Sequence, residues 1–177
     1  MSGVVEPAAS GRAKCRACGG KIEKGELRFG EKLPNPFGDG EASYWFHMDC
    51  AAYRRPEPFL EVLGIQAEAL PEQERLEAIA KPGLEHPRLS RVARLERAPS
   101  GRARCRQCRE AIAKDGFRIA LEIFQEGRFD PIGFIHLECQ ADYFGVRAEP
   151  ERILRAGKGL SEAVRQEAAT ALLKASE

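Results

Sequence analysis

The sequence predicts two tandem, small α+β modules, each a short antiparallel sheet with one or two helices. Three observations lead to this prediction. A nineteen-residue stretch, GRAKCRACGGKIEKGELRF at 11–29, recurs ninety positions later as GRARCRQCREAIAKDGFRI at 101–119, with nine identical positions. A pattern of cysteine and histidine recurs with it, and helix-type sequence follows each copy. A chain of 177 residues has room for one or two small domains.

Each module is expected to open with β-structure. Short apolar-bearing segments lie within 1–11 and 91–101, before the repeated Gly-Arg-Ala, and each predicts a strand that leads into the first cysteine pair. Glu26–Phe29 and Phe117–Ile123 follow the cysteine pairs and have the alternating or apolar character of hairpin strands. These segments predict a small sheet in each module.

A loop is expected to follow in each module. Leu33–Tyr44 is rich in glycine, proline, asparagine and aspartate, and Gln125–Gly133 carries two glycines and a proline. Both compositions are typical of loops. The chain then returns as YWFHMDC in the first module and as GFIHLEC in the second.

Helical sequence follows the last cysteine of each module, in AAYRR and in QADYF. Further along, Leu70–Ala80 predicts a helix with Pro71 near its start, where a missing N–H costs little. Leu160–Ala175 predicts a helix with Ser161 as its N-cap and an apolar stripe suited to core packing.

The segment KPGLEHP, Lys81–Pro87, is expected to separate the two modules. The predicted organisation is therefore a first module with a trailing helix over 1–80, a linker over 81–90, and a second module with trailing helices over 91–177.

All six cysteines and two of the three histidines fall into one repeated pattern. A C-x2-C pair is followed after 28 or 27 residues by H-x2-C. Three thiolates and one imidazole form a closed, soft ligand set that suits structural Zn²⁺ and leaves no position for a catalytic water. The predicted zinc ligands are Cys15, Cys18, His47 and Cys50 in the first module, and Cys105, Cys108, His136 and Cys139 in the second.

Three alternatives to metal binding could account for the cysteines. Disulfides suit the even number, but the N-terminus lacks the pattern of a signal peptide, so an intracellular, reducing compartment is expected. A redox dithiol does not need the downstream H-x2-C, and inert buried cysteines would not recur at matching spacings. Two zinc ions are therefore expected, and they would supply much of the folding energy of such small modules.

The charge is distributed unevenly along the chain. The net charge is only +1, with −2 in residues 1–90 and +3 in residues 91–177. Each repeated stretch, however, carries six basic and two acidic residues, a local excess of +4. Such a run is often only a solvated face, but its recurrence beside the same cysteines weakens that interpretation.

With ligand order, spacing and flanks considered together, both modules resemble the poly(ADP-ribose) polymerase-type zinc finger. The matching stretches are GRAKCRAC, IEKGELRF and YWFHMDC in the first module, and GRARCRQC, IAKDGFRI and GFIHLEC in the second. The resemblance covers about two thirds of the chain and implies recognition of DNA strand breaks.

The resemblance also implies residue roles. Arg12 and Arg102, and likewise Arg28 and Arg118, correspond to arginines that contact the DNA backbone in the family. The side chain corresponding to the family's base-stacking contact is Phe37 in the first module; in the second, Phe129 and Ile132 are candidates. For Phe37 the alternative is a partly buried loop anchor, and for Arg12 and Arg102 it is a plain surface arginine.

The expected function is therefore a zinc-dependent, non-enzymatic protein that binds DNA at strand breaks, nicks or ends in damage response or repair. A separate repair enzyme is a further candidate partner, and the expected location is the cytoplasm or nucleoid of a bacterium or the nucleus of a eukaryote. The alternative is a zinc-stabilised adaptor for protein interactions. An enzyme is disfavoured because no glycine-rich phosphate loop or nucleophile elbow is present. No apolar run approaches the ~18–20 residues of a membrane helix.

Overall fold

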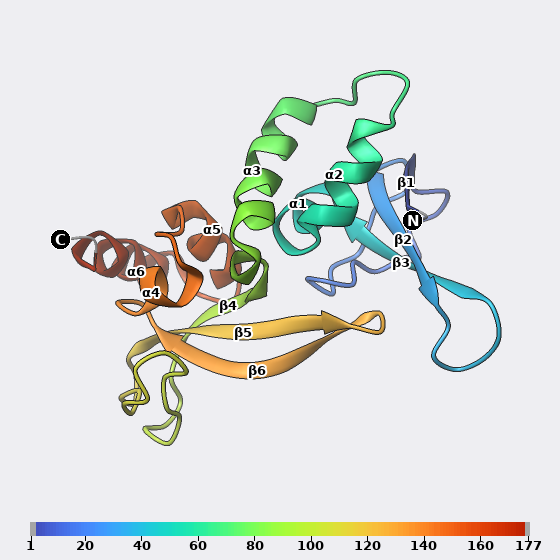
Figure 1. Ribbon diagram of the computed structural model, residues 1–177. Coiled ribbons are helices and arrows are strands. Elements are labelled where there is room, and N and C mark those ends of the chain that lie inside the picture. The colour runs from blue at the N-terminus through green and yellow to red at the C-terminus, as the bar shows by residue number, and fades with distance from the viewer. Residues whose placement is uncertain (1–2, 176–177) are drawn as a thin grey trace. The chain divides into compact units, whose positions relative to one another are not determined.

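The computed structural model describes residues 3–175, which form two compact units. The first unit comprises residues up to Ser90 together with Phe124–Phe129, and the second comprises Arg91–Ile123 and the residues from Asp130 onward. Each unit contains a three-stranded antiparallel sheet with helices beside it, as Figure 1 shows. The predicted fold class, two small α+β modules in tandem, is confirmed.

In the first unit the strand order is β1-β2-β3. Its elements are β1 (Gly3–Pro7), β2 (Leu27–Pro34), β3 (Glu41–His47), α1 (Met48–Arg54), α2 (Pro56–Gly64), α3 (Gln73–Glu85) and the short 3-10 helix η1 (Pro87–Arg91), which runs on into the second unit. Phe29 of β2, Phe46 of β3 and Phe59 of α2 have no exposed surface, and the Phe29 ring contacts the other two in the core.

In the second unit the strand order is β4-β5-β6. Its elements are β4 (Val92–Arg97), β5 (Phe117–Gln125), β6 (Arg128–His136), α4 (Gln140–Phe144), α5 (Pro150–Leu154), the 3-10 helix η2 (Arg155–Gly157) and α6 (Glu162–Lys174). Ile119, Ile135, Ile153 and Leu172 are buried and bring β5, β6, α5 and α6 into this unit's core.

The strands and most helices lie where the sequence predicted them. Ser161 caps α6 through a hydrogen bond from the Val164 N–H to its hydroxyl. The helix predicted over Leu70–Ala80 begins only at Gln73, after Glu72 has taken a left-handed backbone conformation. The helices α2 and α5, each with a proline in its first turn, were not predicted individually.

Two predicted loops are shorter than expected. Strand β3 begins at Glu41, so the loop of the first module spans only 35–40. The prediction of a loop over Gln125–Gly133 is wrong, because β6 begins at Arg128 and a tight turn joins it to β5. Alternating side chains and a left-handed turn at Glu126 and Gly127 form a hairpin that composition alone did not reveal.

The helix α3 continues through Lys81 to Glu85, where the sequence suggested a linker. Pro82 lies inside this helix and gives up one intrahelical hydrogen bond. Gly83 is buried, and a Cβ at this position would lie 3.0 Å from the Pro56 ring. The small residue therefore permits the close approach of α3 to α2.

Candidate metal centres and nucleic-acid interface

Each metal site begins with a tight turn at the C-x2-C pair. In the first unit the Cys15 N–H donates to the Gly20 carbonyl, and the Gly19 N–H donates back to the Cys15 carbonyl. In the second unit, Cys105 makes the equivalent bonds with Glu110 and Arg109. These turns bring both sulfurs of a pair to one side, where they can reach a single ion.

The other two ligands come from the junction between the last strand and the following helix. His47 is the last residue of β3 and Cys50 lies in the first turn of α1. His136 ends β6 in the same way, and Cys139 is the residue before α4. In both units the passage from strand to helix therefore places histidine and cysteine, three positions apart, opposite the cysteine turn.

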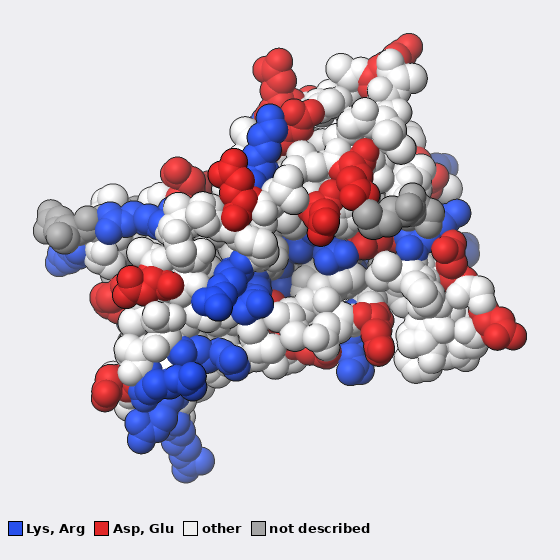
Figure 2. Space-filling model, viewed as in Figure 1, with Lys and Arg blue, Asp and Glu red and all other residues white. Residues whose placement is uncertain are grey.

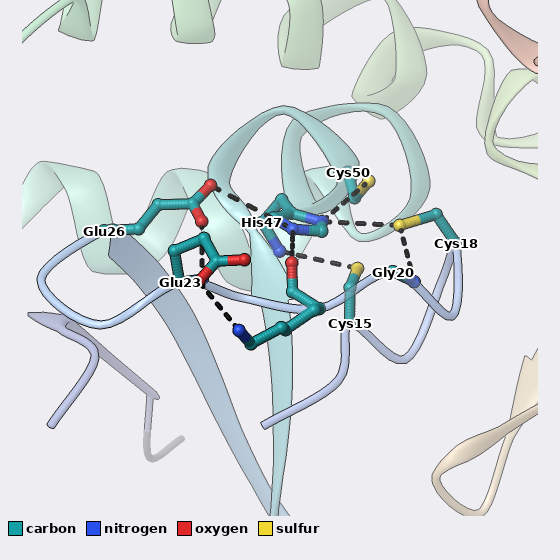
Figure 3. Close-up of polar contacts among 8 residues, drawn as sticks. Cys15, Cys18, Gly20, Glu23, Glu26, His47 and Cys50 are labelled. Carbon is teal, nitrogen blue, oxygen red and sulfur yellow. Dashed lines mark hydrogen bonds and ion pairs between the residues drawn. The ribbon is translucent and has the colours of Figure 1, made fainter. Parts of the chain in front are cut away.

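Each set of four residues has the dimensions of a tetrahedral zinc site. The ligand atoms of each set lie within 4.8 Å of one another. His47 Nδ1 is 3.3 Å from Cys18 Sγ and 3.9 Å from Cys50 Sγ, whereas bond lengths to zinc imply a separation of about 3.6 Å between nitrogen and sulfur. Figure 3 shows the three sulfurs of the first site gathered around His47.

The second site repeats these distances. His136 Nδ1 lies 3.4 Å from Cys108 Sγ and 3.7 Å from Cys139 Sγ. The donor chemistry and the geometry of all eight predicted ligands fit Zn²⁺. The chain therefore holds two structural Zn²⁺ ions, one per unit, each with a closed ligand set.

The second ring nitrogen of each histidine is held by a backbone carbonyl. His47 Nε2 lies 3.0 Å from the Lys21 carbonyl oxygen, and His136 Nε2 lies 3.2 Å from that of Ala111. A carbonyl only accepts, so Nε2 carries the hydrogen and Nδ1 presents its lone pair to the metal. These supporting carbonyls could not be identified from the sequence, because any residue can provide one.

Backbone amides further stabilise the sulfurs. The Gly20 N–H points to Cys18 Sγ at 3.3 Å, as Figure 3 shows, and the His47 N–H points to Cys15 Sγ at 3.4 Å. In the second site the amides of Gln107 and His136 point to Cys105 Sγ. Such bonds favour the thiolate form that zinc requires.

The thiols differ in acidity in the absence of metal. A hydrogen bond with Cys50, together with burial, raises the pKa of Cys15. Burial, with added effects of Cys108 and Cys105, raises the pKa of Cys139 to about 12. Burial also acts to raise the pKa of Cys105, but the amides that point to its sulfur bring it down to about 7.

Exposed basic residues flank both cysteine pairs in the sequence. Figure 2 shows lysines and arginines gathered over the loops that precede β5. The exposed basic residues of the second repeat are Arg102, Arg104, Arg106, Arg109 and Lys114, and those of the first are Arg12, Lys14, Arg16, Lys21 and Lys24. Within residues 3–175, Arg12 and Arg102 make no hydrogen bond or ion pair, so both are free to bind an anion.

Arg28 and Arg118 have a different environment from Arg12 and Arg102. They are only 8% and 7% exposed. Arg28 Nη2 donates to Glu6 at 2.7 Å, and Arg118 Nε and Nη2 donate to Glu96 at 2.9 and 2.7 Å. Both guanidinium groups are thus engaged with a neighbouring strand of their own sheet.

The predicted base-stacking residue Phe37 is 96% exposed. It lies in the 35–40 loop between β2 and β3, where its N–H donates to the Asn35 side chain at 3.0 Å. The Asn35 N–H in turn donates to the Gly40 carbonyl, and Pro36 restricts the intervening backbone. The loop is therefore held in shape while its aromatic side chain projects into solvent.

The candidates in the second module are less accessible. Phe129 is partly buried and packs against the core of the first unit. Ile132 is also partly buried, and its carbonyl accepts a hydrogen bond from Arg106. The two repeats therefore present different side chains at corresponding positions.

The fold and the two ligand sets define a tandem, zinc-stabilised α+β protein. Residues 6–81 match the model of the poly(ADP-ribose) polymerase and DNA-ligase zinc-finger region. The chain is 30% identical over 162 residues, 80% of its length, to a poly [ADP-ribose] polymerase of Sarcophaga peregrina. It is also 30% identical over 130 residues, 66% of its length, to poly [ADP-ribose] polymerase 1 of Gallus gallus.

The chain spans only 16% and 13% of the lengths of these two relatives. The stretches aligned with these relatives, 162 and 130 residues, are longer than one repeat, which agrees with the tandem arrangement of two sites. Residues 6–81 therefore form a zinc finger of the poly(ADP-ribose) polymerase type, and the second unit repeats its ligand pattern. No helix among residues 3–175 is both long enough and apolar enough to cross a membrane.

Proposed function

We propose that this chain is a zinc-dependent, non-enzymatic DNA-binding protein that recognises strand breaks, nicks or ends in DNA repair. The observation that carries the proposal is the 96% exposure of Phe37 at the end of a constrained loop. A break uncovers the face of a base that an intact duplex hides, and stacking of an aromatic ring on such a face contributes ~1–3 kcal/mol. The family resemblance gives the same role to this position.

In this proposal Arg12 and Arg102 bind phosphates. Arginine contacts to phosphate position a protein on DNA without reading its sequence. To bind DNA, Arg28 and Arg118 would have to give up their hydrogen bonds to glutamate in exchange for a phosphate. We therefore assign the main phosphate contacts to Arg12 and Arg102. Backbone contacts combined with one stacking side chain suit a detector of breaks rather than of sequences.

The test uses one DNA sequence in four forms: a closed dumbbell, the same dumbbell nicked, the same gapped, and an open blunt duplex. Binding of the zinc-loaded protein is measured by fluorescence anisotropy at ~150 mM salt, where non-specific phosphate binding is weak. We expect at least tenfold tighter binding to the broken forms, lost on chelation. Equal binding to all four forms would overturn the proposal.

Two charge reversals test the phosphate contacts. Arg12→Glu and Arg102→Glu are expected to retain two zinc ions and to weaken binding to every DNA form. Lys158→Glu is a matched control, because Lys158 is also exposed and the substitution changes the net charge equally. If all three variants lose affinity equally, only bulk charge matters and the assignment of Arg12 and Arg102 is wrong.

A second candidate function is an adaptor for protein interactions. Exposed glutamates line α2 and α3 of the first unit, namely Glu57, Glu61, Glu74 and Glu85. Ile65 and Leu84 are 78% and 50% exposed on the same part of the chain. An adaptor would bind the nicked and closed dumbbells equally weakly, so the four-form experiment distinguishes the two functions.

A further inference from the structure

The tip of the β5–β6 hairpin, FQEGRF at Phe124–Phe129, belongs to the first unit although its sequence lies in the second repeat. The rings of Phe124 and Phe129 are 4.9 Å apart between centroids. Both contact the fully buried ring of Phe46, with centroids 6.1 and 6.4 Å away. The two phenylalanines therefore extend the aromatic core of the first unit.

Two consecutive arginines cover this aromatic pair. The Arg54 guanidinium lies 4.1 Å from the Phe129 ring centroid, and that of Arg55 lies 4.2 Å from the centroid of Phe124. Arg55 also donates two hydrogen bonds to Glu31, at 2.9 and 2.6 Å. A guanidinium held by a carboxylate and stacked on a ring is a specific contact that a lysine would not reproduce.

The turn itself fits the first unit closely. Arg16 Nε donates to the Gly127 carbonyl at 2.6 Å. Gly127 is buried with φ of 79°, and a Cβ there would lie 2.1 Å from Cζ of Tyr44. Only glycine combines this backbone conformation with so close an approach.

We propose that Phe124–Phe129 is an anchoring segment of the first unit, and that Phe37 alone among the predicted stacking residues serves as the base probe. The segment 35–40 and the segment 124–129 lie at corresponding hairpin ends, but the first exposes its aromatic residue, whereas both phenylalanines of the second are partly buried against the core. The anchoring role stands on the contacts above, whereas the single-probe role rests on the proposed function. The protein would therefore read one exposed base face at a break.

The anchoring role is tested with Gly127→Ala in the full-length, zinc-loaded protein. Hydrogen exchange of residues 41–54 reports on the neighbouring strand and helix. The matched control is Gly25→Ala, because Gly25 has a similar φ of 84° but nothing within 4 Å of an added Cβ. We expect residues 41–54 to exchange at least tenfold faster in Gly127→Ala than in Gly25→Ala.

A second substitution distinguishes loss of anchoring from a general folding defect. Tyr44→Ala removes the ring that the added methyl would strike, so Gly127→Ala should have a much smaller further effect on exchange in that background. Zinc content, expected at two ions per chain in every variant, shows that both sites still form. Equal exchange in Gly127→Ala and Gly25→Ala, or no relief by Tyr44→Ala, would overturn the anchoring role.

The single-probe role is tested by the ratio of affinities for the nicked and closed dumbbells. Phe37→Ala should reduce this ratio about tenfold, whereas Phe129→Ala should leave it within twofold of the original. A Phe129→Ala variant that retains zinc but loses the ratio as Phe37→Ala does would overturn the single probe. If the unaltered protein binds all four DNA forms equally, the proposed function and the single-probe role both fail, while the exchange experiment still tests the anchoring role.

Discussion

The guanidinium carbon of Arg28 lies 3.5 Å from the centroid of the Trp45 ring. The same distance separates Arg118 from the ring of Phe134 in the second unit. Arg28 is the cross-strand partner of both Glu6 on β1 and the zinc ligand His47 on β3. Arg28 thus connects all three strands of its sheet next to the zinc ligand His47. This structural role accounts for an arginine at the same position in both repeats, although both arginines are buried.

This arrangement predicts that Arg28 contributes to stability. Arg28→Ala should lower the free energy of unfolding by about 1–3 kcal/mol, since it removes a buried stacked cation and leaves Glu6 without its partner. Arg28→Lys should restore little of this loss, because an ammonium cannot stack and bond in the same way. Urea unfolding of the zinc-loaded protein measures both effects. Arg12→Ala is the control, and an equal loss in that variant would show that the contacts of Arg28 are not responsible.

Loss of one ligand should affect one site. Cys18→Ser is expected to reduce bound zinc from two ions to one per chain, because each closed set depends on its own four donors. Cys108→Ser should do the same from the other site. Elemental analysis after dialysis gives the number of ions, and the double variant should retain none. Loss of both ions from either single variant would contradict independent sites.

Zinc affinity should fall as the pH is lowered, because the bound thiols must be deprotonated. In the metal-free second site Cys139, with a pKa of about 12, is protonated throughout the neutral range. Cys105, with a pKa of about 7, is protonated below that pH and ionised above it. The slope of log Kd against pH gives the number of protons released when zinc binds. This slope should therefore be larger below pH 7 than above it, by up to one proton per ion.

A competition titration with a chromophoric chelator between pH 6 and 8 measures this dependence. Cys18→Ser simplifies the experiment because only the second site then binds zinc. A constant slope across pH 7 would show that Cys105 does not titrate in this range.

The two cysteine turns differ at one position whose backbone is left-handed. Gly19 has φ of 71° in the first unit, and Arg109 has φ of 69° in the second. Left-handed backbone costs a residue with a Cβ about 1–2 kcal/mol. Arg109→Gly should therefore stabilise the second unit by up to about 1 kcal/mol. Arg104 does not have a left-handed backbone, so Arg104→Gly should not increase the stability. Thermal unfolding of the zinc-loaded variants tests this comparison.

Much of the structure could be predicted from the sequence because metal ligands have strict chemistry and spacing. The eight ligands, the strands that flank them and the Ser161 cap all depend on local patterns. The roles of Arg28 and Arg118 could not be predicted in this way. Their burial depends on glutamates more than twenty residues earlier, on another strand.

The hairpin turn shows a second limit of local patterns. Glycine and proline within 125–133 indicated a loop, and nothing nearby indicated that Phe124 and Phe129 would join the core around Phe46. The helical path of Lys81–Glu85 was missed for a similar reason. Packing of Gly83 against Pro56 outweighs the low helix propensity of proline and glycine.

The contact between Gly127 and Tyr44 has a consequence for the history of the chain. Sequence repeats usually drift apart, each free to accept its own substitutions. Here a methyl group gained in the second copy would collide with a ring in the first, so a change at either position alters which changes the other can tolerate. The substitutions that the two halves of the repeated sequence can accept are therefore linked at this point.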